Sequence, residues 1–288
     1  MRFELIEPVT IQEAISSLVK YAGKAKVVAG GTDLLVQMRQ KAVTPEYVVD
    51  VTNIPGLDYI KYDKKEGLKI GALTTISSIE NSKELLKKYS IISKAAGHLG
   101  SPAIRNLGTV GGNLCNASPS AEMAPALIGL SARARIIGPD GERLVLLEDF
   151  FTGPGKTVLK NGELLAEIQL PVPSPNTKGI YFRHAIRRSH DLAIVNVAII
   201  IDFEPRKKIC KDIKIVLGAV APTPMRARNA EGVLRGKKME DGLIQESADL
   251  ASTEAKPITD VRATAWYRKE MVKVFTRQAL NEIKGQSA

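Results

Sequence analysis

The chain has 288 residues, of which 44% are apolar and 25% are charged, a composition typical of globular proteins. Its formal net charge of +10 does not by itself indicate a nucleic-acid-binding protein, because no basic stripe interleaved with aromatic side chains occurs. The first ten residues lack the apolar region of a signal peptide, and no run of about eighteen apolar residues is present. We therefore expect a cytoplasmic protein with no membrane span and no nucleic-acid partner.

The first predicted element is a helix over residues 11–22. Thr10 and Glu13 form a capping-box pattern at its start, and apolar residues recur along it at helical spacing. Gly23 follows at the position of a C-cap glycine. Local signals therefore define both ends of this helix.

A strand at 26–29, a glycine loop and a helix at 34–40 come next. The loop contains Gly30 and Gly31, which let backbone amides converge on one point and let an anion approach closely. The following helix adds its positive N-terminal end. The segment is a candidate phosphate cradle, although a simple tight turn explains it equally well. A Rossmann fold is disfavoured. Asp50 lies about twenty residues after the loop, where a ribose-binding acid is expected, but the G-x-G-x-x-G pattern is missing.

The middle of the chain alternates short strands and helices up to its densest loop. We expect the loop to span residues 101–119, because it concentrates small and polar residues. The other predicted elements are a strand at 47–51, a hairpin at 59–62 and 68–70, helices at 82–89 and 90–99, a short helix from Ala121, and a hairpin at 134–137 and 143–147.

A second glycine-rich segment, residues 106–113, lies inside that loop and continues through Ala117-Ser118-Pro119 to Glu122. Its glycines and small polar side chains predict a second group of hydrogen-bond donors. Two such segments favour one extended ligand with a pyrophosphate between them. A dinucleotide fits this expectation better than a mononucleotide.

The proline-rich stretch 171–176 is the best candidate for a linker. After it, strands precede helices, which is the α+β arrangement. We expect an α+β fold with one domain at 1–175, divided into subdomains at about 1–57 and 58–175, and a second at 176–288. The second domain is predicted to be an antiparallel three-stranded sheet, covered on one face by a helical layer. Its strands are expected at 180–186, 193–203 and 213–220, and its helices at 227–234, 243–252 and 261–283.

The chain has two cysteines, Cys115 and Cys210, which are too few and too distant for a disulfide scaffold or a four-ligand metal site. An iron–sulfur cluster normally needs four thiolates, so this chain cannot hold one alone. His98, His184 and His190 are too dispersed for a metal set. We predict no bound metal and no catalytic acid–base triad.

The two glycine-rich segments make the sequence recognisable. It resembles the flavin subunits of the xanthine dehydrogenase and aerobic carbon monoxide dehydrogenase family of molybdenum hydroxylases. The motifs that carry the resemblance are A-G-G-T-D at Ala29–Asp33, T-V-G-G-N at Thr109–Asn113 and A-S-P at Ala117–Pro119. Further similarity covers 163–171, 181–183 and 187–197, so it runs essentially end to end. The resemblance implies that the first domain binds FAD and is related to the vanillyl-alcohol-oxidase type, and that the second is of the carbon monoxide dehydrogenase flavoprotein type.

The resemblance also implies roles for individual residues. The two glycine segments would bind the pyrophosphate and ribityl of a noncovalent FAD, and Glu122 would contact the adenosine half. Leu165 would lie by the isoalloxazine and Arg183 at its polar edge. From residue type alone, the leucines would instead be core and Arg183 a surface charge. The implied cofactor-binding residues are Val27, Val28, Ala29, Gly30, Gly31, Thr32, Asp33, Leu34, Leu99, Thr109, Val110, Gly111, Gly112, Asn113, Ser118, Glu122, Leu165, Arg183, Asp191 and Leu192, where Leu99 and Leu192 would pack beside the flavin and Asp191 would lie near N5.

The resemblance further implies an electron-transfer subunit. Its partners would be a [2Fe-2S] small subunit, which supplies electrons, and a molybdopterin large subunit, which oxidises the substrate, in a dimer of heterotrimers. The final acceptor would be external. Two alternatives remain open at this stage: an autonomous flavin oxidase or reductase, and a nucleotide-sensing protein without turnover. The substrate cannot be deduced here, because its pocket would lie on another polypeptide.

Overall fold

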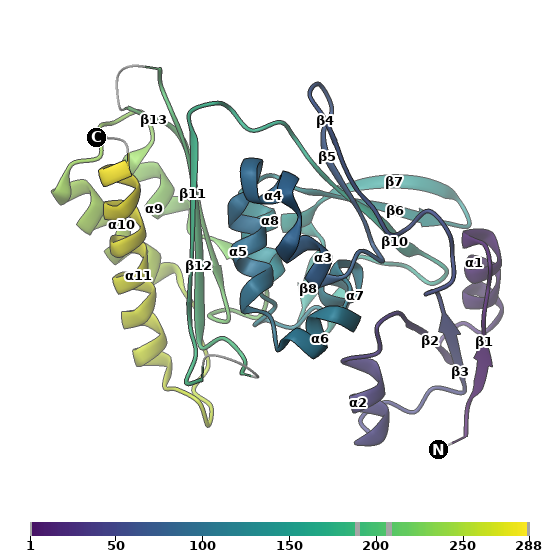
Figure 1. The fold of residues 1–288 in the computed structure, drawn as a ribbon. Helices are drawn as coiled ribbons and strands as arrows, with labels where there is room; N and C mark the ends of the chain where they lie inside the picture. The colour runs from purple at the N-terminus through teal and green to yellow at the C-terminus, as the bar shows by residue number, and fades with distance from the viewer. Residues whose placement is uncertain (1, 188–190, 206–208, 287–288) are drawn as a thin grey trace.

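The computed structural model describes residues 2–187, 191–205 and 209–286 (Figure 1). Three main sheets follow one another along the chain, and each is built from its own continuous stretch of sequence. Helices lie between the second and third sheets and also cover the outer face of the third (Figure 1). Within the described ranges, no helix has the combination of length and apolarity that a membrane crossing requires.

The first sheet is parallel and has the strand order β1-β3-β2. Parallel strands need crossover connections, and each connection here contains a helix: one lies between β1 and β2 in sequence, the other between β2 and β3. A second helix leaves the end of β2 through the first glycine loop. The elements are β1 (Glu4–Ile6), α1 (Ile11–Lys20), β2 (Ala25–Val28), α2 (Leu34–Arg39) and β3 (Tyr47–Asp50).

Helix α1 confirms the first predicted helix. The side chain of Thr10 accepts a hydrogen bond of 3.1 Å from the amide of Glu13. The Glu13 carboxylate accepts one of 2.9 Å from the amide of Val9, one residue before the amide that a capping box uses. The apolar face of the helix is buried in a small core with β3, through Ala14, Ile15 and Leu18.

The second sheet is antiparallel and has the order β4-β5-β10-β6-β7. Both predicted hairpins are present in it. The bounds are β4 (Ile60–Asp63), β5 (Gly67–Gly71), β6 (Arg133–Gly138), β7 (Gly141–Leu146) and β10 (Leu164–Leu170), with a small separate pair β8 (Phe151–Gly153) and β9 (Lys156–Thr157) and a 3₁₀ turn at Leu147–Asp149.

The expected loop at 101–119 is wrong, because it contains two short helices. Ser101 caps the first, accepting a hydrogen bond of 3.3 Å from the amide of Ile104, with Pro102 in its first turn. Thr109 caps the second. Caps and packing form these helices despite their glycine content, which propensity alone disfavours. The helices of this region are α3 (Ile76–Asn81), which was also not predicted, α4 (Lys83–Lys88), α5 (Ser90–His98), α6 (Pro102–Leu107), α7 (Val110–Cys115) and α8 (Met123–Gly129).

The third sheet is antiparallel, as predicted, but it has four strands in the order β11-β12-β13-β14. The added strand is only two residues long and pairs with Val216 and Leu217, too short to leave a sequence pattern. The three predicted helices are present. The bounds are β11 (Thr177–His184), β12 (Val195–Phe203), β13 (Cys210–Gly218), β14 (Met225–Arg226), α9 (Arg228–Leu234), α10 (Asp241–Glu254) and α11 (Ala265–Gln286).

Strand β12 is buried on both faces, so the prediction of a sheet covered on one face is wrong. Val197 and Ile199 pack into the core beneath α9, α10 and α11. Ala198 and Ile200 belong instead to the core that contains residues of α5 and α8, helices that lie on the opposite side of the sheet from α10 and α11 (Figure 1). A Cβ on Gly129 of α8 would lie 2.1 Å from the Ile200 side chain. The third sheet is therefore packed directly against the helices of the preceding region.

Candidate functional site

The first glycine loop leaves four consecutive backbone amides unpaired. Within the described residues, the amides of residues 30–33 donate no hydrogen bond, while the carbonyls of Gly31 and Asp33 accept from the first turn of α2. Gly31 has φ +70°, a conformation that favours glycine. Successive unpaired amides before a helix form a concave anion-binding group. These amides are therefore free to bind an anion.

The second segment does not supply the predicted group of free donors. The four amides of residues 110–113 all donate within the protein: to the carbonyl oxygens of Thr74 and Ala72, and to the side chain and carbonyl oxygen of Thr109. The amides of the first turn of α7 are thus already hydrogen-bonded, either to the capping residue Thr109 or to the backbone at 72–74. Its glycines serve close packing, since a Cβ on Gly111 would lie 2.7 Å from the Ala72 carbonyl oxygen.

Asn113 is the exception within the second segment. Its side-chain oxygen is buried and has no hydrogen-bond partner. A buried acceptor without a partner is costly in a folded protein. This oxygen therefore marks a place where a ligand hydroxyl or N–H group could donate.

The two glycine segments lie against each other although they are far apart in the sequence. A Cβ on Gly30 would lie 1.8 Å from the carbonyl oxygen of Leu107, at the end of α6. A Cβ on Gly108 would lie 3.5 Å from the Thr32 hydroxyl. The structure thus brings residues 30–32 against residues 107–108.

Glu122 is at the centre of a buried polar cluster. Its side chain is 7% exposed and accepts a hydrogen bond of 2.7 Å from Nε of Arg183, whose side chain is 4% exposed. The Tyr181 hydroxyl also donates to it, and Nδ2 of Asn196 does so at 3.4 Å. Glu122 precedes α8, whereas the three donors come from β11 and β12. The cluster therefore joins the segment before α8 to the third sheet.

Arg183 extends this cluster to the segment before β12. Its NH2 group donates a hydrogen bond of 2.5 Å to the backbone carbonyl of Asp191. The Asp191 carboxylate accepts from the amides of Arg187 and Leu192, and the first of these hydrogen bonds is the main cause of its lowered pKa. Glu122, Arg183 and Asp191 are thus one connected unit.

Burial sets the protonation behaviour of the cluster. It raises the pKa of Glu122, an effect opposed by the Arg183 charge and by the three donors. Burial also raises the pKa of Tyr181 well above its ordinary value. His98, whose ring centroid lies 5.9 Å from that of Tyr181, has its pKa lowered by burial and then by the Arg183 charge. Both effects favour the neutral form of His98.

The remaining predicted residues fall into three groups: leucines at the core, one exposed leucine, and residues that flank the glycine segments. Leu165 is 7% exposed and belongs to the large core, and Leu99 packs against the same core. Leu192 is 47% exposed, so it is not a core residue in this chain. The others flank the glycine segments: Val27 and Val28 end β2, Ala29 precedes the loop, Leu34 begins α2, and Ser118 lies between α7 and α8.

Two polar residues of the cluster were not predicted as site residues. Asn196 interrupts the apolar run of β12, and that interruption was the detectable signal. Its side-chain oxygen is buried without a partner. Tyr181 lies in a stretch that resembles the family, but its contact with Glu122 joins residues remote in sequence.

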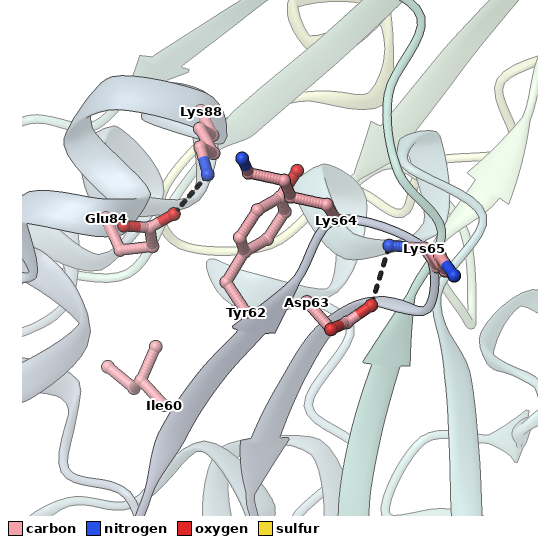
Figure 2. Close-up of a pocket in the computed structure, with 7 residues that line it drawn as sticks. All are labelled: Ile60, Tyr62, Asp63, Lys64, Lys65, Glu84 and Lys88. Atoms are coloured by element: carbon pink, nitrogen blue, oxygen red, sulfur yellow. Dashed lines mark hydrogen bonds and ion pairs between the residues drawn. The ribbon is translucent and has the colours of Figure 1, made fainter.

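One open depression, of 770 Å³, lies elsewhere, between the β4–β5 hairpin and α4 (Figure 2). Lys88 is held there, 2.6 Å from Glu84 and 3.3 Å from the centroid of the Tyr62 ring. The Asp63 carboxylate accepts a hydrogen bond of 2.6 Å from the amide of Lys65. None of its lining residues belongs to the glycine segments or the Glu122 cluster. We therefore do not regard this depression as the functional site.

The cysteines and histidines do not form a metal site in the described part of the chain. Cys115 ends α7 and Cys210 begins β13, and both are free. No group of three or more metal-ligating side chains comes together among the described residues. His190 lies outside those residues.

Comparison with known proteins gives the class of this fold and site. Residues 1–173 match the family described as the FAD binding domain in molybdopterin dehydrogenase, and residues 180–283 match the CO dehydrogenase flavoprotein C-terminal domain. The molecule is thus a flavoprotein subunit of an oxidoreductase. The chain belongs to the family of FAD-binding medium subunits of xanthine dehydrogenase and carbon monoxide dehydrogenase, and its cofactor is FAD.

Relatives and solved structures match nearly the whole chain. The glyceraldehyde dehydrogenase medium chain of Sulfolobus acidocaldarius is 32% identical over 98% of both chains. The carbon monoxide dehydrogenase medium chain of Afipia carboxidovorans is 32% identical over 99% of this chain and 98% of its own. A structure of reconstituted CO dehydrogenase from Oligotropha carboxidovorans has a TM-score of 0.94 at 31% identity, covering 99% of this chain and 98% of that one.

Proposed function

We propose that this chain is the electron-transfer subunit of a three-part molybdenum hydroxylase. It would receive electrons from a [2Fe-2S] small subunit and pass them to an external acceptor. A molybdopterin large subunit would oxidise the substrate, in a dimer of heterotrimers. Relatives of this chain are named as medium chains or FAD subunits of dehydrogenases, which supports a role within a larger assembly.

The observation that carries the proposal is the row of unpaired amides at 30–33 lying against α6 and α7. Four donors at one point, next to a helix start, suit a diphosphate. The orphaned oxygen of Asn113 suits a hydroxyl of the chain between the diphosphate and the ring. FAD has both a diphosphate and a hydroxyl-bearing chain, so it can pair with both features. Packing alone requires neither of them. The residues present therefore fit the cofactor.

The polar cluster would serve the other end of the ligand. When bound, FAD can take up electrons singly and release them in pairs. Arg183 would hold a fixed positive charge at the polar edge of the ring, while Leu99 and Leu192 would limit water beside it. Asp191 would stand near N5. Leu165, buried in the core, would support the ring from beneath rather than expose a large surface to it.

The proposal also retains a relation of the first domain to the vanillyl-alcohol-oxidase type. What supports it is the order of the elements: a strand, a glycine loop and a helix, followed by a second glycine segment that packs against the first. Both segments come from the domain that we expect at 1–175.

Copurification tests the proposal directly. A [2Fe-2S] subunit and a molybdenum subunit should accompany this chain from its native source. The isolated FAD-loaded chain should not be bleached when mixed anaerobically with candidate aldehydes or purines. Chemically reduced, it should still pass electrons to an artificial acceptor. Prompt bleaching by a substrate alone would instead establish an autonomous flavin oxidase, and bound FAD that cannot be reduced and reoxidised would establish a nucleotide sensor.

A further inference from the structure

The roles that family resemblance implies for Glu122 and Arg183 conflict with their geometry. Glu122 would contact the adenosine half of FAD, and Arg183 the polar edge of the isoalloxazine. In an extended FAD these groups lie at opposite ends. The two side chains, however, are joined by a hydrogen bond of 2.7 Å. The two residues therefore cannot contact opposite ends of the ligand.

We propose that Glu122 is a positioning residue for Arg183 at the isoalloxazine end, and not a contact of the adenosine half. The inference rests on the proposed function, because it takes Arg183 to lie at the flavin ring. Glu122 fixes the Arg183 guanidinium group through Nε, which leaves the NH2 group aimed at the carbonyl of Asp191.

The carboxylate of Glu122 has little capacity left for a ligand. One oxygen accepts from Arg183, and the other from Tyr181 and Asn196. The side chain is 7% exposed, so a cofactor could reach it only by displacing these donors. These contacts indicate that Glu122 acts by holding Arg183 in place, and not by binding the cofactor itself.

A fixed orientation matters because Arg183 can donate in several directions. A guanidinium group presents five N–H donors in one plane. With Nε held by Glu122 and NH2 by the Asp191 carbonyl, that plane is determined. Glu122 also places a negative charge beside the arginine, which offsets part of its positive charge at the ring. Glu122 is therefore expected to influence the flavin reduction potential through Arg183.

The test is a double-mutant cycle with the flavin midpoint potential as the readout. The variants are Glu122→Gln, Arg183→Gln and the double substitution, each measured in the FAD-loaded chain by equilibration with reference dyes. Glutamine at position 122 keeps an acceptor for Arg183 but removes the charge. We expect Glu122→Gln to raise the potential, because an uncompensated Arg183 favours the reduced flavin. In the Arg183→Gln background, the same change should raise the potential by less, because the part of the effect that acts through Arg183 is absent.

A matched control separates positioning from simple loss of a buried ion pair. Glu231 is 1% exposed and accepts a hydrogen bond of 2.6 Å from Arg226. It lies in α9, on the side of the third sheet away from α6 and α7 (Figure 1). Glu231→Gln should lower thermal stability as Glu122→Gln does, but leave the flavin potential and FAD affinity unchanged. Glu122→Gln should keep the FAD dissociation constant within about threefold of wild type, well under the tenfold that 1.4 kcal/mol represents.

Two results would overturn the proposal. The first is an unchanged potential in Glu122→Gln, which would make the residue structural only. The second is a loss of FAD affinity of about a hundredfold in a folded Glu122→Gln protein, which would restore a direct adenosine contact. If Glu122→Gln does not fold, Glu122→Asp, which keeps the charge but shortens the side chain, replaces it in both backgrounds, and a shift in potential that is equal in the two contradicts action through Arg183. A wild-type chain that binds no FAD would instead refute the proposed function.

Discussion

A Cβ on Gly30 would lie 1.8 Å from the carbonyl oxygen of Leu107. The atom approached belongs to the backbone of α6, so no side-chain rotation can relieve the clash. Even the smallest side chain at this position must push the loop at 30–33 away from α6 and α7. The unpaired amides of that loop would then be displaced from the rest of the site.

We therefore expect Gly30→Ala to weaken FAD binding by at least about tenfold, or 1.4 kcal/mol. The measurement is the FAD dissociation constant by quenching of flavin fluorescence, with FAD retained after gel filtration as a second readout. Gly242→Ala is the control, because that glycine lies in α10 with nothing within 4 Å of an added Cβ. Wild-type affinity in Gly30→Ala would show that the amides at 30–33 are not the phosphate site.

Gly111→Val should act through folding. Its Cβ would lie 2.7 Å from the carbonyl oxygen of Ala72, which accepts the Gly111 amide at 2.9 Å. Overpacking of this kind costs about 1–3 kcal/mol. We expect a lower urea midpoint, with FAD loss following from it. Gly232→Val, at an open position of α9, should shift the midpoint far less. A Gly111→Val protein of wild-type stability would contradict close packing as the reason for this glycine.

FAD should be released completely by acid precipitation. The cysteine nearest the glycine segments is Cys115, and burial raises the pKa of its thiol to about 12. Because the thiolate is the nucleophile, a thiol with such a pKa is unreactive at neutral pH. All yellow colour should appear in the supernatant, in wild type and in Cys115→Ser alike. Colour that stays in the wild-type pellet but not in the Cys115→Ser pellet would reveal a cysteinyl flavin.

Acid stability should depend on Asp260. Desolvation alone would raise the pKa of this group, but hydrogen bonds from the Arg262 amide and the buried Arg268 side chain lower it from 3.8 to about 2. A depressed carboxyl pKa adds stability above the unfolded value, and that stability is lost as the pH falls from about 4 toward 2. Between pH 5 and pH 2, the urea midpoint should fall further in wild type than in Asp260→Asn. Equal falls in both proteins would exclude Asp260 as the cause.

Most regular elements were predictable because their causes are local. The N-cap of α1 depends on Thr10 and Glu13, three residues apart. The long strands of the third sheet follow from runs of β-branched residues. Helices α6 and α7 were missed for the opposite reason. They contain proline and glycine, and their formation depends on caps and on packing against the chain at 72–75.

The sequence by itself determined the local elements, the two glycine segments and the family, since each rests on residues close together in the chain. Only the tertiary structure decided how the segments are used. It shows that the amides at 30–33 are unpaired, whereas those at 110–113 are consumed by the protein. It also joins Glu122 to Arg183, which are 61 residues apart. That contact depends on how the third sheet, whose strand β11 carries Arg183, packs against the helices that follow Glu122, which no local pattern encodes.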